Sequence, residues 1–342
     1  MPISCAVNAT TAKIRAIHGK MFTKENYREM LTRKTVPELA EYLARTPRFK
    51  DAFKEVDPNT VHRGYLEELL YRENFRTYVR LCKFQMLDKM PFYGFLIKKR
   101  EIECILSLIN CLNSGLENSY LEDLPGYVIK HSEIDLLELS KASDFQQMLK
   151  MLKGTPYYKV LVKISPTEDG LADYTECELQ LRTMYFENLF SEIKKGFPSG
   201  EAKELTDMIL KEIDVKNIIN AYRMKAFFGF SPEEIKRRSF KFSYMGKKRF
   251  KRFCECESPE QMLELISRRT NMSSEDATIE TMINRVKYRN LCHTIARSGY
   301  AAVSMYAFTQ LCDIEVENIV HIIEGIRYKV DSSFIESRLL IC

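Results

Sequence analysis

The side chains best suited to chemistry are the five histidines and ten cysteines of this 342-residue chain. The run His-Ser-Glu at 131–133 could begin a zinc-deaminase motif, but no Pro-Cys-x-x-Cys follows to complete such a site. Cys254 and Cys256 lack a second cysteine pair at zinc-finger spacing. Cys292 and His293 are neighbours and do not form a site by themselves. We therefore expect no metal site.

Motifs for nucleotide and acyl chemistry are missing as well. Gly246-Lys247 lacks the spacing of a phosphate-binding loop, and no Gly-x-Ser-x-Gly elbow occurs. Acidic residues are plentiful, but no two stand out as a general acid and a general base. Their positions are equally well explained by helix faces exposed to solvent. The sequence predicts no catalytic residues, no cofactor and no direct nucleotide binding. A helical enzyme without a recognisable motif stays open as an alternative.

One segment, residues 236–252, departs from the average composition, and we call it the basic segment. It holds nine basic residues in seventeen positions, no acidic residue, and interleaved aromatic residues. These nine are the candidate partner-binding residues: Lys236, Arg237, Arg238, Lys241, Lys247, Lys248, Arg249, Lys251 and Arg252. The aromatic residues are Phe240, Phe242, Tyr244 and Phe250.

Three interpretations of the basic segment are open. Basic side chains with aromatic ones can bind single-stranded nucleic acid, with an affinity that falls as salt is added. The same mixture can form a helix–loop–helix whose aromatic residues enter the core while its charges face an acidic partner protein, or only water. The net charge of +5 is small for this length and does not by itself indicate nucleic acid. Nucleic acid is the least favoured of the three.

Helices are expected to position these residues. Only 13 Gly and 11 Pro interrupt the chain, which leaves room for long helices. Hydrophobic residues make up 45% of a length sufficient for two or three core-forming units. Strand-like alternation is short, as at 160–164 and 241–244. The sequence therefore predicts an all-α fold.

Capping signals set the expected helix ends. Thr-Val-Pro-Glu at 35–38 and Ser-Pro-Glu-Glu at 231–234 are typical helix starts, and Ser-Ser-Glu-Asp at 273–276 suggests another. Gly115 is expected to end a helix. Residues 202–228 read as two helices that meet near Asp214.

Two sequence elements occur three times, about a hundred residues apart. The first is a helix start, which is Glu-Ile-Glu-Cys-Ile-Leu at 101–106, Asp-Val-Lys-Asn-Ile-Ile at 214–219 and Glu-Val-Glu-Asn-Ile-Val at 315–320. The second is Thr46-Pro47, which recurs as Thr155-Pro156 and, more loosely, as Thr270-Asn271. This predicts three similar helical lobes, 1–125, 126–230 and 231–342, with Ile105, Ile218 and Ile319 at equivalent buried positions.

The sequence shows no pattern typical of a membrane span or an export signal. No stretch approaches eighteen consecutive apolar residues, so no membrane span is expected. Residues 6–18 contain no sustained apolar run, so no export signal is expected. The cysteines are scattered, and Cys104 and Cys111 lie one heptad apart on an apolar helical face, as buried free thiols do. We expect a reduced compartment and no disulfides.

The repeated elements also carry a family resemblance. Asp-Val-Lys-Asn-Ile at 214–218, followed by Arg223 and Lys225, resembles the D-x-x-N-I-x-x-x-x-R-x-K segment of the central-stalk C subunit of V/A-type rotary ATPases, the equivalent of the d subunit of the eukaryotic vacuolar enzyme. Leu-x-x-Thr-Pro at 43–47 and 152–156 is similar to the family's L-x-x-T-P-Y elements.

The resemblance extends to both ends of the chain. Residues 8–16 resemble the family's opening helix, and residues 317–329 fit its last long helix. Three positions depart from the pattern: Arg48 stands in place of the aromatic residue after the first Thr-Pro, the third Thr-Pro is lost, and Cys104 replaces the repeated Asn. Order, spacing and full-length coverage make the resemblance specific, although no single motif does.

The resemblance implies a funnel of three similar lobes. Its narrow side would rest on the membrane rotor ring of proteolipid subunits, and its open side would receive the central shaft, which is built from the D and F subunits. It implies a non-catalytic coupling protein, peripheral at the cytoplasmic face of the membrane, in a complex that transports protons or sodium ions or makes ATP. The ligands of the transported ion would belong to the membrane ring and not to this chain.

Overall fold

The computed structural model describes residues 3–84, 87–116, 120–121, 124–167, 169–270 and 278–341, without the side chains of 3–8, 88, 269 and 270. The described residues form helices and connecting loops with no strand among them, which confirms the all-α prediction. The chain divides into two compact units. The first unit holds residues 1–86, 203–236 and 242–342, and the second holds residues 87–202 and 237–241.

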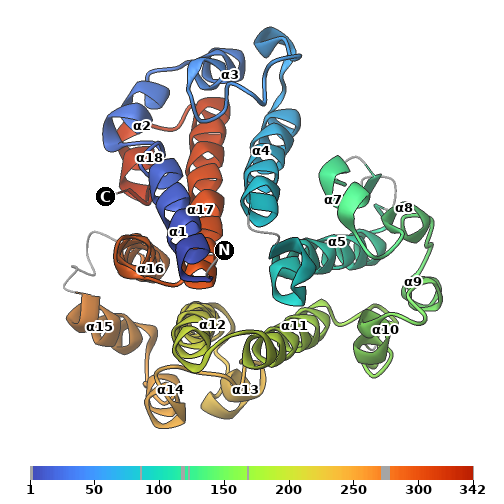
Figure 1. Cartoon of the computed structure of the whole chain (residues 1–342). Helices are drawn as coiled ribbons and strands as arrows, with labels where there is room; N and C mark the ends of the chain where they lie inside the picture. The colour runs from blue at the N-terminus through green and yellow to red at the C-terminus, as the bar shows by residue number, and fades with distance from the viewer. Residues whose placement is uncertain are drawn as a thin grey trace. The chain divides into compact units, whose positions relative to one another are not determined.

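The helix α17 (Ala301–Tyr328) is the centre of the first unit. Every residue from 301 to 312 is buried, because α17 packs against α1 (Ile3–His18), α4 (Arg63–Phe84) and α16 (Ile279–Arg297). Figure 1 shows α17 in red beside α1 and α16. The other described helices of this unit are α2 (Lys24–Leu31), α3 (Val36–Arg45), η1 (Pro58–Thr60), most of α12 (Ser199–Phe228), α13 (Pro232–Arg237), α14 (Lys247–Cys254), α15 (Pro259–Thr270) and α18 (Ser332–Arg338).

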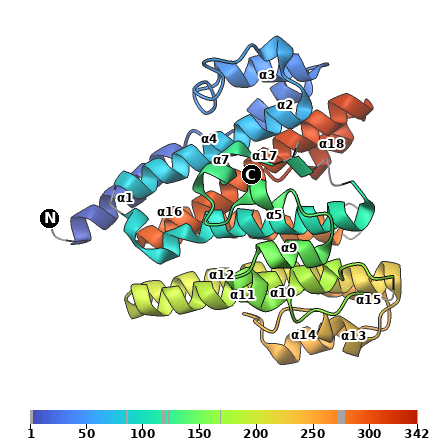
Figure 2. The same cartoon turned by 90° about the vertical axis from the view of Figure 1, so that its right-hand side faces the viewer.

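The second unit is built on α5 (Phe95–Ser114) and α11 (Tyr174–Gly196), which pack against each other and are seen lengthwise in Figure 2. Lys98 on α5 forms an ion pair of 3.0 Å with Glu192 on α11. Its other described helices are short: η2 (Leu87–Lys89), η3 (Pro91–Gly94), α7 (Gly126–His131), α8 (Leu136–Leu139), α9 (Phe145–Met151) and α10 (Pro156–Leu161).

The capping residues act as the sequence indicated. Thr35 caps α3 by accepting a hydrogen bond from the Glu38 backbone N–H at 3.3 Å. The Ser231 hydroxyl likewise accepts the N–H of Glu234 at 3.3 Å before α13. Gly115 ends α5 with a positive φ of 65°, a conformation that costs glycine little. These starts and stops are confirmed.

The expected helix starts at 101, 214 and 315 differ from the structure. Residues 202–228, expected as two helices, form the single helix α12 through Asp214. Asp214 begins no helix, because its carboxylate bonds a distant loop instead of the N–H groups of a following turn. The helices α5 and α17 likewise run without a break through Glu101 and Glu315, so none of the three recurring elements begins a helix. The expected start at 273–276 and the repeat position Asn271 lie outside the described residues.

The first residue of each recurring helix start is a buried acid. The exposed fractions of Glu101, Asp214 and Glu315 are 1%, 7% and 2%. Burial of a carboxylate is unfavourable unless it is hydrogen-bonded or paired. Each of the three accepts a hydrogen bond from one backbone N–H and from at least one side chain of other segments.

The partners of these acids lie far away in sequence. Glu101 accepts hydrogen bonds from the Ser132 hydroxyl at 2.7 Å and the Glu133 backbone N–H at 2.6 Å. Glu315 accepts the Phe22 backbone N–H at 3.0 Å and pairs with Arg48 at 2.9 Å. Both acids therefore fix a loop onto the middle of a long helix.

The residue after each described Thr-Pro also contacts one of these acids. Arg48 pairs with Glu315 in the first unit, and the hydroxyl of Tyr157 bonds Glu101 in the second. Arg48, the departure noted in the sequence, thus makes the contact that Tyr157 makes in the other unit. The predicted lobe boundaries stay a prediction. The isoleucines 105, 218 and 319 are buried, with exposed fractions of 0%, 7% and 0%, and their equivalence by superposition also stays a prediction.

Candidate functional site

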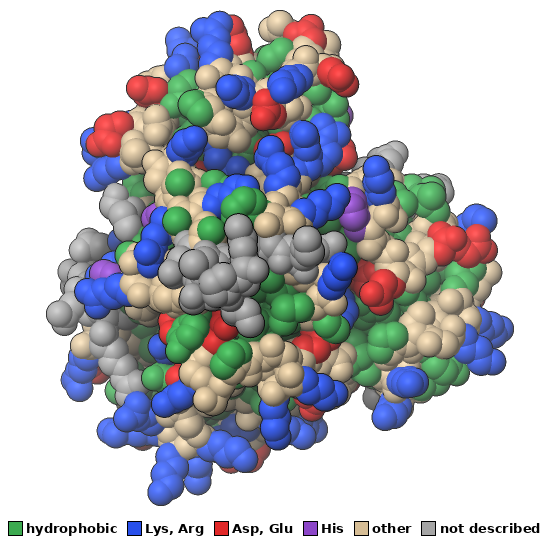
Figure 3. Space-filling model, in the orientation of Figure 1, with side chains coloured by type: hydrophobic (Ala, Val, Ile, Leu, Met, Phe, Trp, Pro, Cys, Tyr) green, Lys and Arg blue, Asp and Glu red, His purple; other side chains and the backbone are tan. Residues whose placement is uncertain are grey.

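The nine candidate residues of the basic segment are divided between the two compact units. Lys236 and the five cations of α14 belong to the first unit, and Arg237, Arg238 and Lys241 belong to the second. We therefore consider the α14 cluster by itself. It consists of Lys247, Lys248, Arg249, Lys251 and Arg252, all exposed. Figure 3 shows Lys and Arg gathered at the lower edge of this face, where Figure 1 places α14.

The helix α14 separates charge from apolar surface. Phe253 and Cys254 are buried, and Phe250 packs against the same core. That core also contains Ile218 from α12 and Met262 from α15. The apolar side of α14 is thus occupied within the protein, and its five cations remain exposed.

Few of these charges are neutralised within the described part of the chain. Lys251 lies 3.6 Å from Glu255, which also pairs with Lys236 at 3.4 Å. Lys247, Lys248 and Arg249 form no ion pair with a described residue. They occupy the first turn of α14, where positive charge is unfavourable because the exposed N–H groups already make that end positive. An acidic partner would relieve this repulsion.

The aromatic residues of the basic segment do not form a stacking surface. Phe240 is buried and meets the ring of Phe186 edge-on at 5.6 Å. Tyr244 is half exposed, and the ammonium group of Lys211 lies 4.6 Å from its ring centre. Stacked aromatic platforms are what single-stranded nucleic acid requires. The arrangement gives that alternative no support: Phe240 and Phe250 pack inward, while Tyr244 stays half exposed.

Asp214 holds the loop that leads into α14. Its carboxylate accepts the Ser243 hydroxyl at 2.6 Å and the Met245 backbone N–H at 2.7 Å. Gly246 follows with a φ of 85°, which favours glycine, and α14 begins after it. Burial raises the pKa of Asp214, and these hydrogen bonds oppose the increase. Asp214 thereby determines where the basic helix begins.

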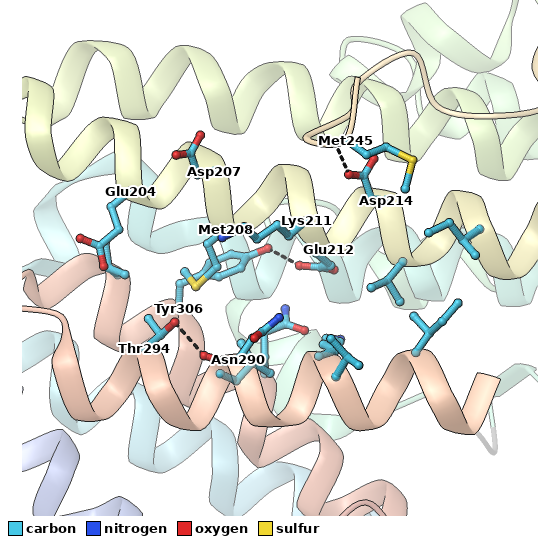
Figure 4. A pocket seen from close by; sticks show the side chains of 18 of the residues that line it. Glu204, Asp207, Met208, Lys211, Glu212, Asp214, Met245, Asn290, Thr294 and Tyr306 are labelled. Atoms are coloured by element: carbon cyan, nitrogen blue, oxygen red, sulfur yellow. Dashed lines mark hydrogen bonds between the residues drawn. The ribbon is translucent and has the colours of Figure 1, made fainter. Parts of the chain in front are cut away.

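The first unit also contains a groove, which Asp214 and Met245 help to line (Figure 4). Its volume is about 380 Å³, within the range of ligand-binding clefts. Its walls are α12 and α16, and α17 contributes Val303, Tyr306 and Gln310. Figure 4 places Glu204 and Thr294 toward one end, and Asp214 and Met245 toward the other.

The groove has an acidic end and an apolar end. Glu204 and Asp207 line it one turn apart on α12, followed by Met208. Farther along, the lining residues are Val215, Ile218, Ile266 and Ile283. Between these ends, the hydroxyl of Tyr306 donates a 2.7 Å hydrogen bond to Glu212. The groove was not anticipated from the sequence, since it forms only where three separate helices meet.

The residues considered for metal chemistry are not brought together. His131 bonds the carbonyl of Tyr127 at 2.8 Å, and Ser132 and Glu133 bond Glu101 as described above. Cys254 is buried, which raises its pKa to about 11 and makes it a poor thiolate ligand. Among the residues that the structure covers, no group of three or more potential metal ligands occurs.

Cysteines and apolar helices were also considered in the sequence. Eight cysteines have described side chains, and all are free thiols, with Cys104 and Cys111 buried as expected. Across the described ranges, no helix is both long enough and apolar enough to cross a membrane.

Comparison with known proteins gives a consistent result. The family model for the ATP synthase (C/AC39) subunit matches residues 10–338. The chain is 27% identical over 227 residues to the C subunit of the A-type ATP synthase of Methanosarcina mazei, which covers 65% of this chain and 60% of the relative. It is 26% identical over 228 residues to the protein of the same name from Archaeoglobus fulgidus, with coverage of 66% and 62%. The chain thus spans about three fifths of the length of these relatives.

Proposed function

The chain belongs to the C/AC39 family of ATP synthase subunits, and from that premise we propose that it is a non-catalytic central-stalk subunit of a V/A-type rotary ATPase. In this role it couples the shaft, built from the D and F subunits, to the membrane ring of proteolipid subunits. It acts as a peripheral protein at the cytoplasmic face of the membrane. The complex transports protons or sodium ions, or makes ATP. The observation that carries the proposal is the family match over residues 10–338.

The proposal includes three similar lobes arranged as a funnel. The buried acids at positions 101, 214 and 315 support it, because each recurring helix start uses its first residue to fix a loop. A coupling part must transmit torque without yielding, and close-packed helices transmit strain. Hydrogen-bonded acids in the middle of long helices add cross-links of the required kind.

Within this function, the basic cluster on α14 binds an acidic surface of a neighbouring subunit. Its exposed and largely unpaired cations support this assignment. Charge complementarity of this kind accelerates association and selects partners.

Purification of the tagged full chain from its own membranes tests the function. We expect catalytic, shaft and ring subunits of one ATPase to co-purify in constant proportions, and ATP hydrolysis to be found only in the assembled fraction. Should the chain elute alone from gently solubilised membranes while an intact ATPase is recovered without it, the proposal is wrong.

A further inference from the structure

The floor of the groove includes one polar side chain, that of Gln310. Gln310 on α17 is only 6% exposed, lines the groove, and forms no hydrogen bond with any described residue. A glutamine amide offers two donors and an acceptor oxygen. The amide atoms of Gln310 are not sealed from solvent, so an occupant of the groove can reach them. The floor is therefore suited to an occupant that carries a polar group between its apolar contacts.

The acidic end of the groove lacks a counter-charge. Neither Glu204 nor Asp207 forms an ion pair with a described residue. The nearest side chains of α16 at that end, Asn290 and Thr294, are uncharged. Two lysines line the groove, and the ammonium group of one of them, Lys211, lies over the ring of Tyr244. The other, Lys287, precedes Thr294 by seven residues, about 10 Å along the helix. This end is suited to a cation from outside.

The length of the groove indicates the shape of its occupant. Along α12 the lining residues run from Glu204 to Ile218, a distance of about 21 Å at 1.5 Å per residue. That corresponds to about four turns of a second helix lying alongside. Aliphatic walls flanked by a charged end are the arrangement by which grooves accept amphipathic helices.

We propose that this groove binds an amphipathic helix of a partner protein, with aliphatic side chains toward Ile218 and Ile283 and a Lys or Arg toward Glu204 and Asp207. A polar side chain between them bonds the amide of Gln310. The proposal rests on the proposed function only because the partner is expected within the assembled complex. It concerns a surface distinct from the basic cluster on α14.

Photo-crosslinking in cells tests the proposal. The photoreactive amino acid p-benzoylphenylalanine replaces Asn290, an exposed residue at the edge of the groove. The control carries it at Ala296, an exposed position of the same helix that does not line the groove. We expect irradiation to join position 290, and not position 296, to one helical segment that combines aliphatic residues with a Lys or Arg. Digestion and mass spectrometry identify that segment.

Charge reversal supplies the second measurement. Glu204→Lys with Asp207→Lys should lower the yield of the adduct about tenfold, because a cationic helix end would then meet like charge. The matched control, Asn220→Lys, adds charge at an exposed position of α12 outside the groove and should leave the yield unchanged.

Several results would overturn the proposal. They are no adduct from position 290, the same adduct from both positions, attachment to a small molecule, or a yield insensitive to charge reversal. Co-purification with ATPase subunits is scored separately in the same cells. A chain that assembles but yields no adduct leaves the proposed function in place and refutes the groove proposal. A chain that yields the adduct but does not assemble with ATPase subunits supports the groove proposal and refutes the proposed function.

Discussion

Single buried side chains join distant segments of this protein, and Glu315 is the clearest case. It pairs with Arg48 across 267 positions of sequence and also accepts the backbone N–H of Phe22. Burial alone would lower the pKa of Arg48, but the charge of Glu315 raises it, so the guanidinium stays protonated. Breaking such a pair leaves one buried charge uncompensated.

Arg48→Met should therefore destabilise the protein by about 3–5 kcal/mol. Adding Glu315→Gln should recover most of this loss, because the amide removes the unpaired charge while its oxygen still accepts the Phe22 N–H. Urea denaturation followed by circular dichroism compares the stability of wild type, the single variant and the double variant. If the double variant is as unstable as Arg48→Met alone, the loss comes from packing of the Arg48 side chain and not from charge.

Asp214 provides a test that depends on pH. Its pKa in the folded protein is raised by burial, so its contribution to stability is complete below its ordinary pKa of about 4 and is lost as pH rises through the raised value. Asp214→Asn does not titrate. We expect wild type to be more stable than the variant at pH 3.5, with the difference shrinking toward pH 7. If the difference instead grows with pH, the hydrogen bonds from Ser243 and Met245 lower the pKa of Asp214 by more than burial raises it.

At the scale of elements, α14 combines an occupied apolar side with an exposed basic side. Changing Lys247, Lys248 and Arg249 to Glu should slow assembly with ATPase subunits most at low ionic strength, and added salt should reduce the difference. Stopped-flow association at two salt concentrations measures this effect. Assembly at the wild-type rate in low salt would make α14 a solvated face.

Folding of the triple variant provides the control for that experiment. The three positions are exposed and lie in the first turn of α14, where Glu interacts favourably with the helix end. The midpoint temperature of thermal unfolding should therefore be unchanged or slightly higher. A clear loss of stability would show that the cations have a role within the fold.

The ends of several helices could be predicted from the sequence, but the contacts between helices could not. Thr35, Ser231 and Gly115 act within one turn of chain, so their capping roles could be predicted from local pattern. Asp214 was mistaken for a helix start, because a buried acid in mid-helix looks the same in sequence as an acid in a first turn. The acids of the groove were missed for a related reason. Glu204 and Asp207 read as a solvated face until α16 and α17 are placed beside them.

At the scale of the whole molecule, the proposed function requires that the chain have no nucleotide chemistry of its own. The warrant is the missing phosphate-binding loop in the sequence. We expect isothermal titration of the purified chain with millimolar ATP and Mg²⁺ to give no binding heat, and phosphate release to stay at background. The assembled complex, assayed in parallel, should hydrolyse ATP. Micromolar binding with turnover by the isolated chain would refute the coupling role.

The core of the first unit has a consequence for how the chain is made. One cluster of buried residues combines side chains between Tyr27 and Leu70 with others between Val316 and Leu339. A ribosome that adds about 5–20 residues per second needs roughly ten to fifty seconds to reach Glu315 after Arg48. Throughout that interval the early apolar side chains lack their final partners. The nascent chain is therefore expected to depend on chaperones until its last helices emerge.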